Sequence, residues 1–302
     1  LFTPGWTNYN KRVAYQSYDV THLFRSGTNV IAAVLGPGWY KGDITWLDMR
    51  NIYGKGMALS LELTVTMAKE KEETRLTTDE SWKASFGPIH YSELYHGETY
   101  DARDEIDGWA VAGFDDEGWS AASIVEFDAS RVVAQDGPYV RRRERLEPVA
   151  LFETPRGEKV LDFGQNLTGF VSFSVKGNAG DRVVLDHAEV LDAEGNFYTD
   201  NMRTARNRIE YTLRGEGEEV YEPHFTFQGF RYLRLQEHPG TIDPSSFVAV
   251  VVHSEMEETV EFECSNELLN QLHHNILWGW KGNSLDIPTD CPQRDERLGW
   301  TG

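Results

Sequence analysis

Polar and apolar residues alternate in parts of the first 140 residues, which is the pattern of half-buried β-strands. In residues 59–67 (LSLELTVTM) every second side chain is apolar, and successive side chains of a strand point to opposite faces of a sheet. Residues 30–36 (VIAAVLG) form a continuous apolar run that ends in Gly-Pro-Gly, as expected of a strand buried on both faces. Residues 114–119 (FDDEGW) are predicted to form a turn followed by a packed tryptophan. These patterns predict a β-sandwich in residues 1–140.

The same kind of pattern returns in residues 141–256. Residues 171–177 (VSFSVKG) alternate, with their two valines and the phenylalanine between them on the inward face. Further strands are predicted at 182–191, 225–236 and 247–254. The segments NAGD and DAEGN between them have the composition of turns, and the glycine of DAEGN is expected at positive φ. Many short strands separated by turns predict a second sandwich or jelly roll.

A charged run, RRRERLE, occupies residues 141–147. Basic runs can bind nucleic acid, but this chain is acidic overall. We therefore interpret the run as a solvated connection between the two β regions.

The period of the apolar residues changes near the end of the chain. In residues 264–280 the apolar positions have helical spacing, and they are Leu268, Leu269, Leu272, Ile276, Leu277 and Trp280. Ser265 is predicted as the N-cap of this helix. One helix cannot bury so wide an apolar face alone, so a helical domain is predicted to begin in residues 257–302. Within these residues, the face is expected to pack on the second β region, to pair with a second copy of the chain as a homodimer, or to be poorly ordered.

The last segment, residues 286–302 (DIPTDCPQRDERLGWTG), carries a dense set of charged residues between prolines and a tryptophan. The prolines end the preceding helix near Asn283. A carboxylic acid held in a partly buried pocket can protonate a glycosidic oxygen, while neighbouring Asp and Arg side chains bind sugar hydroxyls. The residue types alone leave two interpretations open: half of an active site, or a structural loop held by salt bridges.

Composition narrows the classes of partner. The chain has 302 residues, enough for two domains and part of a third. Its net charge is −20, which disfavours nucleic acid and anionic membranes as partners. Aromatic residues reach 12%, as in β-rich and sugar-binding proteins. The two cysteines, Cys264 and Cys291, have no partner at metal-ligand spacing, so no metal site is predicted and no cofactor is expected.

The last segment resembles the motif that opens the catalytic domain of bacterial and fungal α-L-rhamnosidases. The remainder of the chain agrees with this resemblance. TPGWTNYNKRVAYQSYDVTHLF, together with NVIAAVLGPGWYKGD, is similar to their N-terminal, galactose-binding-like β-sandwich, and LDFGQNLTGFVSFSVKGNAGD through EPHFTFQGFRYLRL is similar to their lectin-like module. The resemblance implies that residues 257–302 begin an (α/α)₆ catalytic barrel. It also implies that this chain is a fragment in which the first sandwich is truncated at its start.

The resemblance assigns a role to four residues of the loop. Glu296 is the expected general acid, Asp290 and Arg294 are expected to bind rhamnose hydroxyls, and Trp300 is expected to line the sugar pocket. Members of the family invert the anomeric carbon, so the two catalytic carboxyl groups should lie roughly 6.5–9.5 Å apart. An Asp that follows the WTG of the motif and a distant Glu, the general base, are expected beyond Gly302.

The resemblance predicts that the full-length parent hydrolyses terminal non-reducing α-L-rhamnose residues from glycosides with inversion, and that residues 1–302 alone are inactive. Two alternatives remain. Residues 1–140 could serve as an accessory carbohydrate-binding or purely structural module, with calcium a candidate ligand although no Asp-x-Asp-x-Asn-Gly loop is present. The parent could also be an inverting hydrolase of another sugar. The sequence leaves the location of the protein open between the cytoplasm and the cell exterior or periplasm.

Overall fold

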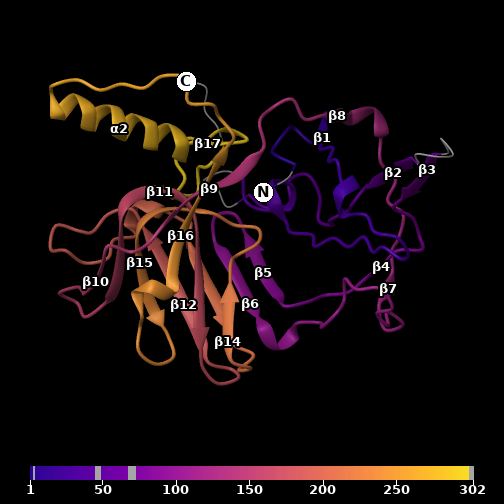
Figure 1. The fold of residues 1–302 in the computed structure, drawn as a ribbon, viewed down its shortest axis with the longest axis horizontal. Helices are drawn as coiled ribbons and strands as arrows, with labels where there is room; N and C mark the ends of the chain where they lie inside the picture. The colour runs from indigo at the N-terminus through magenta and orange to yellow at the C-terminus, as the bar shows by residue number, and fades with distance from the viewer. Residues whose placement is uncertain (3, 45–48, 67–72, 299–302) are drawn as a thin grey trace.

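The architecture is mainly β, as predicted. A computed structural model of the chain describes residues 1–2, 4–44, 49–66 and 73–298. Figure 1 shows two lobes, with the amino-terminal residues on one side and a large curled sheet on the other, and one long helix lying along the sheet. No helix in the described ranges is long and apolar enough to cross a bilayer.

The larger lobe is built on a ten-stranded sheet. Its main path runs β5-β6-β13-β12-β15-β11-β16-β9, and β10 and β14 also pair with β11. The strands are β5 (Ile89–Glu93), β6 (Gly97–Asp101), β9 (Val140–Leu146), β10 (Ala150–Glu153), β11 (Lys159–Lys176), β12 (Arg182–Ala188), β13 (Arg208–Thr212), β14 (Glu218–Tyr221), β15 (Gln228–Glu237) and β16 (Phe247–Ser254). The strands predicted at 171–177, 182–191, 225–236 and 247–254 are confirmed, and Gly195 has the expected positive φ of 85°.

The smaller lobe contains short strand pairs, one short α-helix and 3₁₀ turns in its described residues. The strand pairs and the helix are β1 (Val13–Tyr15) with β8 (Val132–Ala134), β2 (Glu62–Thr66) with β3 (Glu73–Thr77), β4 (Lys83–Ala84) with β7 (Ser120–Ala121), and α1 (Gly38–Lys41). The alternation predicted at 59–67 is confirmed for the five residues of β2, where Leu63 and Val65 are half-buried between exposed neighbours, whereas residues 59–61 form no strand and Met67 lies outside the described residues. The predicted turn at 114–119 is also present, with Trp119 packed against Phe114 at 5.5 Å between ring centroids.

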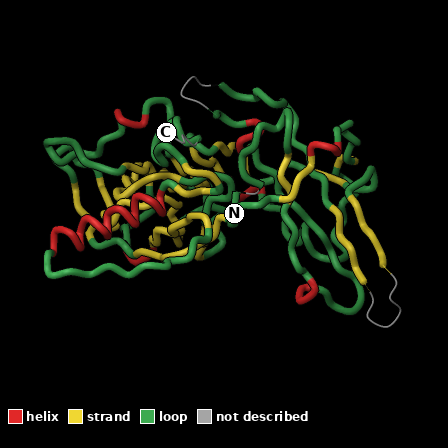
Figure 2. Tube along the Cα trace, turned by 90° about the horizontal axis from the view of Figure 1, so that it is seen from above, coloured by secondary structure: helices red, strands yellow, loops and turns green. Residues whose placement is uncertain are grey.

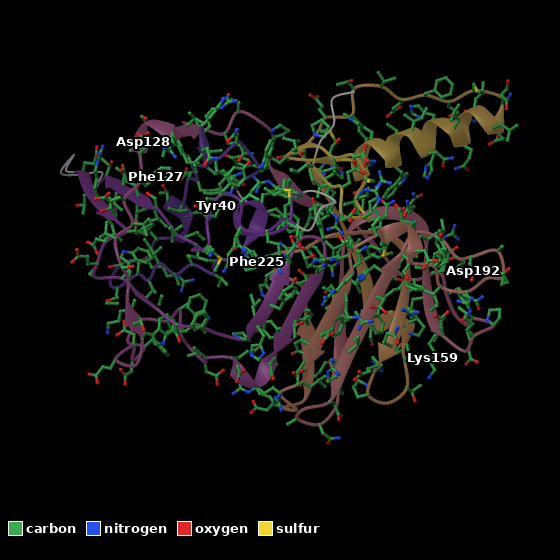
Figure 3. All side chains as sticks on the ribbon, turned by 180° about the vertical axis from the view of Figure 1, so that it is seen from behind. Tyr40, Phe127, Asp128, Lys159, Asp192 and Phe225 are labelled. Atoms are coloured by element: carbon green, nitrogen blue, oxygen red, sulfur yellow. The ribbon has the colours of Figure 1, made fainter. Side chains whose placement is uncertain are left out.

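The buried strand predicted at residues 30–36 is wrong. The segment forms no strand with any described residue, and Val30, Val34 and Leu35 are 43–50% exposed. A continuous apolar run becomes a central strand only when strands pair on both of its edges, and none does so here. Gly36 instead lies against the ring of Phe225, where a Cβ on the glycine would be 2.3 Å from Cγ of that ring. Phe225 lies at the junction of the two lobes (Figure 3).

The interpretation of residues 141–147 as a connection is also wrong. Residues 141–146 lie in β9, an edge strand of the large sheet that pairs antiparallel with β16. Arg142 pairs with Glu222 at 3.0 Å, and Arg141 approaches Glu255 at 3.8 Å. Charged side chains on an edge strand discourage pairing with other chains, which explains a strand with so polar a sequence.

The hairpin β5–β6 joins the large sheet although it comes from the first 140 residues. β6 pairs in parallel with β13. The buried carboxylate of Glu98 in β6 accepts hydrogen bonds from the hydroxyl of Tyr221 at 2.7 Å and from the backbone N–H of His224 at 3.0 Å. The two β regions therefore share one sheet, and the domain boundary near residue 140 stays a prediction.

The buried apolar residues form two clusters. The first fills the inside of the curled sheet and includes Phe173, Phe230 and Phe247. The second lies between the sheet and the smaller lobe, and includes Tyr9 and Trp39 from that lobe and Tyr95 from the β5–β6 turn. The second cluster holds the lobes together beside the carboxyl-terminal loop.

The long helix α2 (Glu267–Gly282) confirms the helical period of residues 264–280. Its N-cap is Asn266, not Ser265, because the Asn266 side chain accepts the N–H of Leu268 at 3.0 Å. Figure 2 shows the helix lying across the strands, and Trp278 packs against the core of the sheet.

Most of the apolar face predicted for this helix stays exposed, and of its six residues only Leu277 is half-buried. Leu268, Leu272 and Ile276 remain 53–80% exposed. The helix thus packs on the second β region through another face, and dimerisation through the exposed face stays a prediction.

Candidate active site

The carboxyl-terminal loop follows α2 without a break in the described chain. The helix ends at Gly282 with Asn283 as its C-cap, close to the predicted end. A small hairpin of β17 (Ser284–Leu285) and β18 (Ile287–Pro288) then turns at Asp286, which has a φ of 67°. The chain then crosses the large sheet at β15, where the N–H of Gly229 donates to the carbonyl of Pro292 at 3.1 Å. The end of helix α2 is fixed too, because the Thr168 hydroxyl donates to the carbonyl of Gly282 at 2.9 Å.

Three of the four predicted site residues contact one another. The Arg294 guanidinium lies 2.8 Å from Oδ2 of Asp290 and 3.0 Å from Oε2 of Glu296. Glu296 is the most buried of the three, with 15% of its side chain exposed. Trp300 lies outside the described residues. The loop therefore presents a carboxyl group, a second carboxylate and a guanidinium on one side.

The thiol of Cys291 takes part in the same group. Its Sγ lies 3.0 Å from Oδ2 of Asp290, and burial, with the hydrogen bond to Asp290, raises the pKa of Cys291 to about 12. Cys291 therefore stays a neutral donor. The hydrogen bond from this thiol, and then that from Arg294, lower the pKa of Asp290. Asp290 is thus an ionised acceptor, which suits a group that binds sugar hydroxyls.

Two residues that the sequence analysis gave no role hold the loop from beneath. Asp295 is fully buried and accepts hydrogen bonds from the backbone N–H of Thr204 at 3.2 Å and from its hydroxyl at 2.7 Å. Arg297 is also fully buried. Its guanidinium donates to the carbonyl oxygens of Leu94 and Phe227 and to Oδ1 of Asn207.

Alternation within RDER was the signal that could have separated these roles. In an extended segment, residues two apart share a face. Arg294 and Glu296 face the candidate site, whereas Asp295 and Arg297 face the protein interior. The loop thus combines both interpretations left open by the sequence, because one face is a salt-bridged anchor and the other carries the candidate chemistry.

Substitution of Gly229 tests whether close contact with β15 fixes the position of the carboxyl-terminal loop on the sheet. A Cβ at this position would lie 2.8 Å from Cγ of Pro292 and 2.9 Å from the backbone nitrogen of Gln293. We expect Gly229→Ala to destabilise the protein by about 1–3 kcal/mol and to displace the loop, measured by thermal unfolding and by a crystal structure of the variant. Gly118→Ala, where nothing lies within 4 Å of the new Cβ, is the control. Equal melting temperatures for the two variants would contradict the contact.

Asp286 gives a prediction for pH dependence. Burial raises its pKa to about 6, so between pH 4 and pH 6 the folded protein keeps a proton that the unfolded chain releases. Stability contributed by the protonated form is therefore lost as pH rises through this window. The side chain is half-buried, so we expect a loss of about 1–2 kcal/mol after solvent screening.

The variant Asp286→Asn should remove this loss, because asparagine cannot ionise and tolerates the left-handed backbone. Urea unfolding at pH 4 and pH 7 measures the effect. We expect the free energy of unfolding of the variant to rise relative to that of the wild type between pH 4 and pH 7. A difference between the two proteins that does not change with pH would contradict the assignment.

The described ranges contain three groups of side chains that could hold a metal. In each group, acidic, His or Cys side chains have ligand atoms within 4.8 Å of one another: Asp43, Glu93 and His96; His90, Asp101 and Asp104; and Asp290, Cys291 and Glu296. The third includes a neutral thiol and lies against Arg294, which disfavours a cation.

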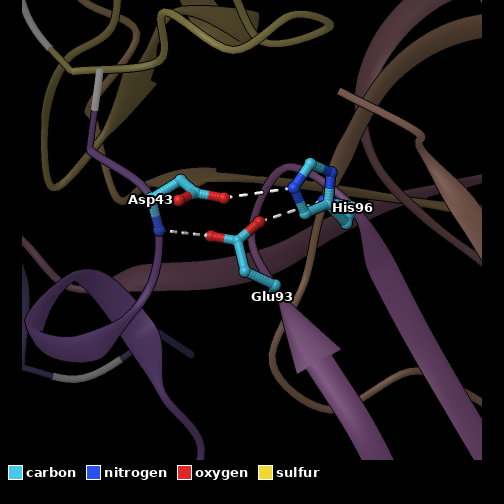
Figure 4. A group of neighbouring side chains, drawn as sticks. All are labelled: Asp43, Glu93 and His96. Carbon is cyan, nitrogen blue, oxygen red and sulfur yellow. Dashed lines mark hydrogen bonds and ion pairs between the residues drawn. The ribbon is translucent and has the colours of Figure 1, made fainter. Parts of the chain in front are cut away.

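The first of these groups is largely buried and links the two lobes (Figure 4). His96 Nε2 lies 3.1 Å from Oδ2 of Asp43. The Glu93 carboxylate accepts the backbone N–H groups of Asp43 at 2.9 Å and Tyr95 at 2.6 Å, and burial raises its pKa. The oxygens of Glu93 thus already accept hydrogen bonds. The group is best explained as a structural contact that joins residue 43 to the β5–β6 turn. The calcium hypothesis stays a prediction.

Comparison with known domain families agrees with this architecture. Residues 1–144 match the α-L-rhamnosidase N-terminal domain, residues 152–253 the bacterial α-L-rhamnosidase concanavalin-like domain, and residues 257–302 the bacterial α-L-rhamnosidase 6 hairpin glycosidase domain. The candidate site lies in the third match. All three matched models describe domains of one family of glycosidases. More narrowly, the chain belongs to the α-L-rhamnosidase family.

Individual relatives support the family assignment along the whole chain. An α-L-rhamnosidase of Streptomyces avermitilis is 48% identical over 99% of this chain, which covers 29% of that protein. One from Formosa agariphila is 38% identical over the full chain, which covers 33% of it. This chain therefore spans about a third of the length of the curated relatives it matches.

Solved structures agree. The native α-L-rhamnosidase from Aspergillus terreus matches with a TM-score of 0.93 and 44% identity, over 99% of this chain and 35% of that one. The Streptomyces avermitilis α-L-rhamnosidase complexed with L-rhamnose also matches with a TM-score of 0.93 and 44% identity, over 99% of this chain and 29% of that one.

Proposed function

We propose that this chain supplies the general acid of an inverting α-L-rhamnosidase, and that the acid is Glu296. The observation that carries the proposal is the contact of Glu296 with Arg294, itself paired with Asp290, in a loop fastened by two buried residues. The matched 6 hairpin glycosidase domain and the L-rhamnose complex of a relative support a rhamnoside as the substrate.

In the proposed reaction, the protonated Glu296 carboxyl gives its proton to the glycosidic oxygen. The bond between this oxygen and the anomeric carbon breaks, and its electron pair stays on the leaving alcohol. A water molecule adds to the opposite face of the sugar and loses a proton to a second carboxylate. Room for that water requires a separation of roughly 6.5–9.5 Å between the two carboxyl groups. We assign the second carboxylate to a part of the helical domain outside residues 1–302.

The remaining residues of the proposed site bind the sugar. Asp290 accepts hydrogen bonds from rhamnose hydroxyls, and Arg294 donates hydrogen bonds to them. Trp300 lines the pocket. Arg294 already contacts both carboxylates, so a bound hydroxyl would compete with one of these contacts. Binding of the sugar is therefore linked to the position of the Glu296 side chain.

The test uses the complete polypeptide, a chain in which the helical domain continues as in the relatives. With 4-nitrophenyl α-L-rhamnoside in deuterated buffer, proton NMR should show β-L-rhamnose as the first product. Release of the α-anomer first would contradict inversion. A preference for other nitrophenyl glycosides would favour a different sugar.

Residues 1–302 alone are expected to show no turnover, and measurable hydrolysis by this purified chain would contradict the placement of the second carboxylate. Titration of L-rhamnose into the same chain, with and without calcium, tests the accessory-binding hypothesis for residues 1–140. Heat of binding, or a raised melting temperature, would support it.

A further inference from the structure

A short segment of the second β region reaches the candidate acid. Residues 203–207 connect the 3₁₀ turn η4 (Asp200–Met202) to β13. We propose that Arg203 in this segment is a positioning residue for Glu296, so that the β region contributes directly to the active site. This inference rests on the proposed function, because it concerns how the acid delivers its proton.

The first evidence is the geometry at the carboxyl group. Arg203 Nη1 lies 3.1 Å from Oε2 of Glu296, and Arg294 Nη2 lies 3.0 Å from the same oxygen. A guanidinium donates hydrogen bonds and cannot accept them. The acidic proton therefore cannot point from Oε2 toward either arginine. We infer that Oε1 of Glu296 carries the proton that is given to the substrate. Two guanidinium groups at one oxygen thus decide which oxygen faces the substrate.

The backbone conformation of Arg203 is unusual for a residue other than glycine. It has a φ of 56° and a ψ of −114°, although left-handed values of φ favour glycine. Such conformations persist where the surrounding structure over-determines them, and they cluster at functional sites. Here the preceding residue, Met202, is buried in the core between the lobes. The strained backbone of this turn therefore directs the Arg203 side chain from the β region toward the loop.

Buried contacts on either side fix the distance between the segment and the loop. Thr204 donates twice to Asp295. Asn207, which also has a positive φ of 49°, donates to the carbonyl of Gln293 and accepts from Arg297. The segment and the loop are thus joined on both sides of Glu296, and Arg203 is held in register with it.

Arg203 itself contributes little to stability by this argument. Its side chain is 43% exposed, and exposed ion pairs stabilise proteins only weakly. Removing it should therefore change reactivity more than folding. Arg203 Nη1 also lies 3.7 Å from Oδ1 of the buried Asp295, but Asp295 keeps both hydrogen bonds from Thr204 when Arg203 is replaced.

The experiment compares two rhamnosides in the complete polypeptide. 4-Nitrophenolate leaves with little help from an acid, whereas an alkyl alcohol leaves only when protonated. For Arg203→Met we expect kcat on the alkyl rhamnoside to fall on the order of 10²-fold. On the nitrophenyl rhamnoside we expect it to change less than about threefold, with KM and melting temperature nearly unchanged. Arg203→Lys should recover part of the loss. Arg206→Met, at an exposed arginine of the same segment, is the matched control.

Each other outcome overturns the proposal. Equal losses on both substrates, with a lowered melting temperature, would make Arg203 structural. A raised KM at constant kcat would make it a sugar contact. An unchanged rate on the alkyl rhamnoside would give it no role.

A second measurement needs no substrate, so it also separates this proposal from the proposed function. The carbon-13 resonance of the Glu296 carboxyl, assigned with Glu296→Gln, should move in Arg203→Met and stay in Arg206→Met. An unmoved resonance overturns the contact. Failure of the wild type on every rhamnoside would instead reject the proposed function and leave this resonance as the deciding result.

Discussion

Replacing Glu296 with glutamine is expected to remove nearly all hydrolysis of alkyl rhamnosides by the complete polypeptide, with a fall in kcat on the order of 10²- to 10⁴-fold. Glutamine has nearly the same shape as glutamate and can still meet Arg203 and Arg294, but it has no acidic proton to give. The fold should be preserved, because Asp295 and Arg297, not Glu296, make the buried contacts of the loop. Steady-state kinetics on alkyl and nitrophenyl rhamnosides measure the effect.

The control for this experiment is Glu257→Gln, at an exposed glutamate outside the loop. It should behave as the wild type on both substrates. Wild-type turnover of the alkyl rhamnoside by Glu296→Gln would show that the acid is another residue. A loss that is equal on both substrates would indicate that Glu296 has a role other than proton donation.

Replacing Arg297 with methionine is expected to cause the largest loss of stability among these variants, about 3–5 kcal/mol. The guanidinium is fully buried and donates to two backbone carbonyls and to Asn207. It also lies over the rings of Tyr95 at 5.2 Å and Phe227 at 4.9 Å. Methionine fills much of the space but leaves the acceptors without donors, and an unsatisfied buried acceptor is costly. Urea unfolding measures the loss.

Burial also lowers the pKa of Arg297 to about 10. Burying the charged guanidinium is therefore unfavourable in itself, and the hydrogen bonds that it donates offset this cost. Arg297→Lys should therefore recover only part of the stability, because one ammonium cannot reach acceptors from three separate segments. Arg25→Met, at an exposed arginine, is the control and should change the free energy of unfolding by less than about 0.5 kcal/mol. Similar unfolding of the Arg297 and Arg25 variants would contradict the anchoring role.

Activity should follow stability in the Arg297 variant but not in the Glu296 variant. Arg297 is next to Glu296 in the chain, so a loosened anchor displaces the acid as well as weakening the fold. This contrast separates a residue that holds the loop from one that carries its chemistry.

Four of the ten strands of the large sheet, β11, β12, β15 and β16, could be predicted from local pattern. Residues 171–177 and 247–254 carry their apolar side chains where a sheet with one buried face requires them. The helix could be predicted from its period, and its end near Asn283 from the prolines that follow it. The candidate acid and its two neighbours in the loop could be predicted from the resemblance of the motif, not from pattern.

The errors share one cause. Residues 30–36 were predicted as a buried strand, yet they lie at the surface beside Phe225. Residues 141–147 were interpreted as a solvated connection, yet all but the last of them lie in the edge strand β9. In both, the local pattern describes how apolar a segment is, whereas a strand exists only if another segment pairs with it.

The sequence by itself determined which faces of the strands are apolar, where the helical period begins, and which residue types meet in the last loop. Only the tertiary structure decided that β6 lies beside β13, that Asp295 and Arg297 are buried while Arg294 and Glu296 face outward, and that Arg203 contacts Glu296 from 93 positions away. Periodicity and turn chemistry act over a few neighbouring residues, so they are written locally in the chain. Pairing and burial depend on segments far apart in sequence, so they are fixed only when those segments pack together.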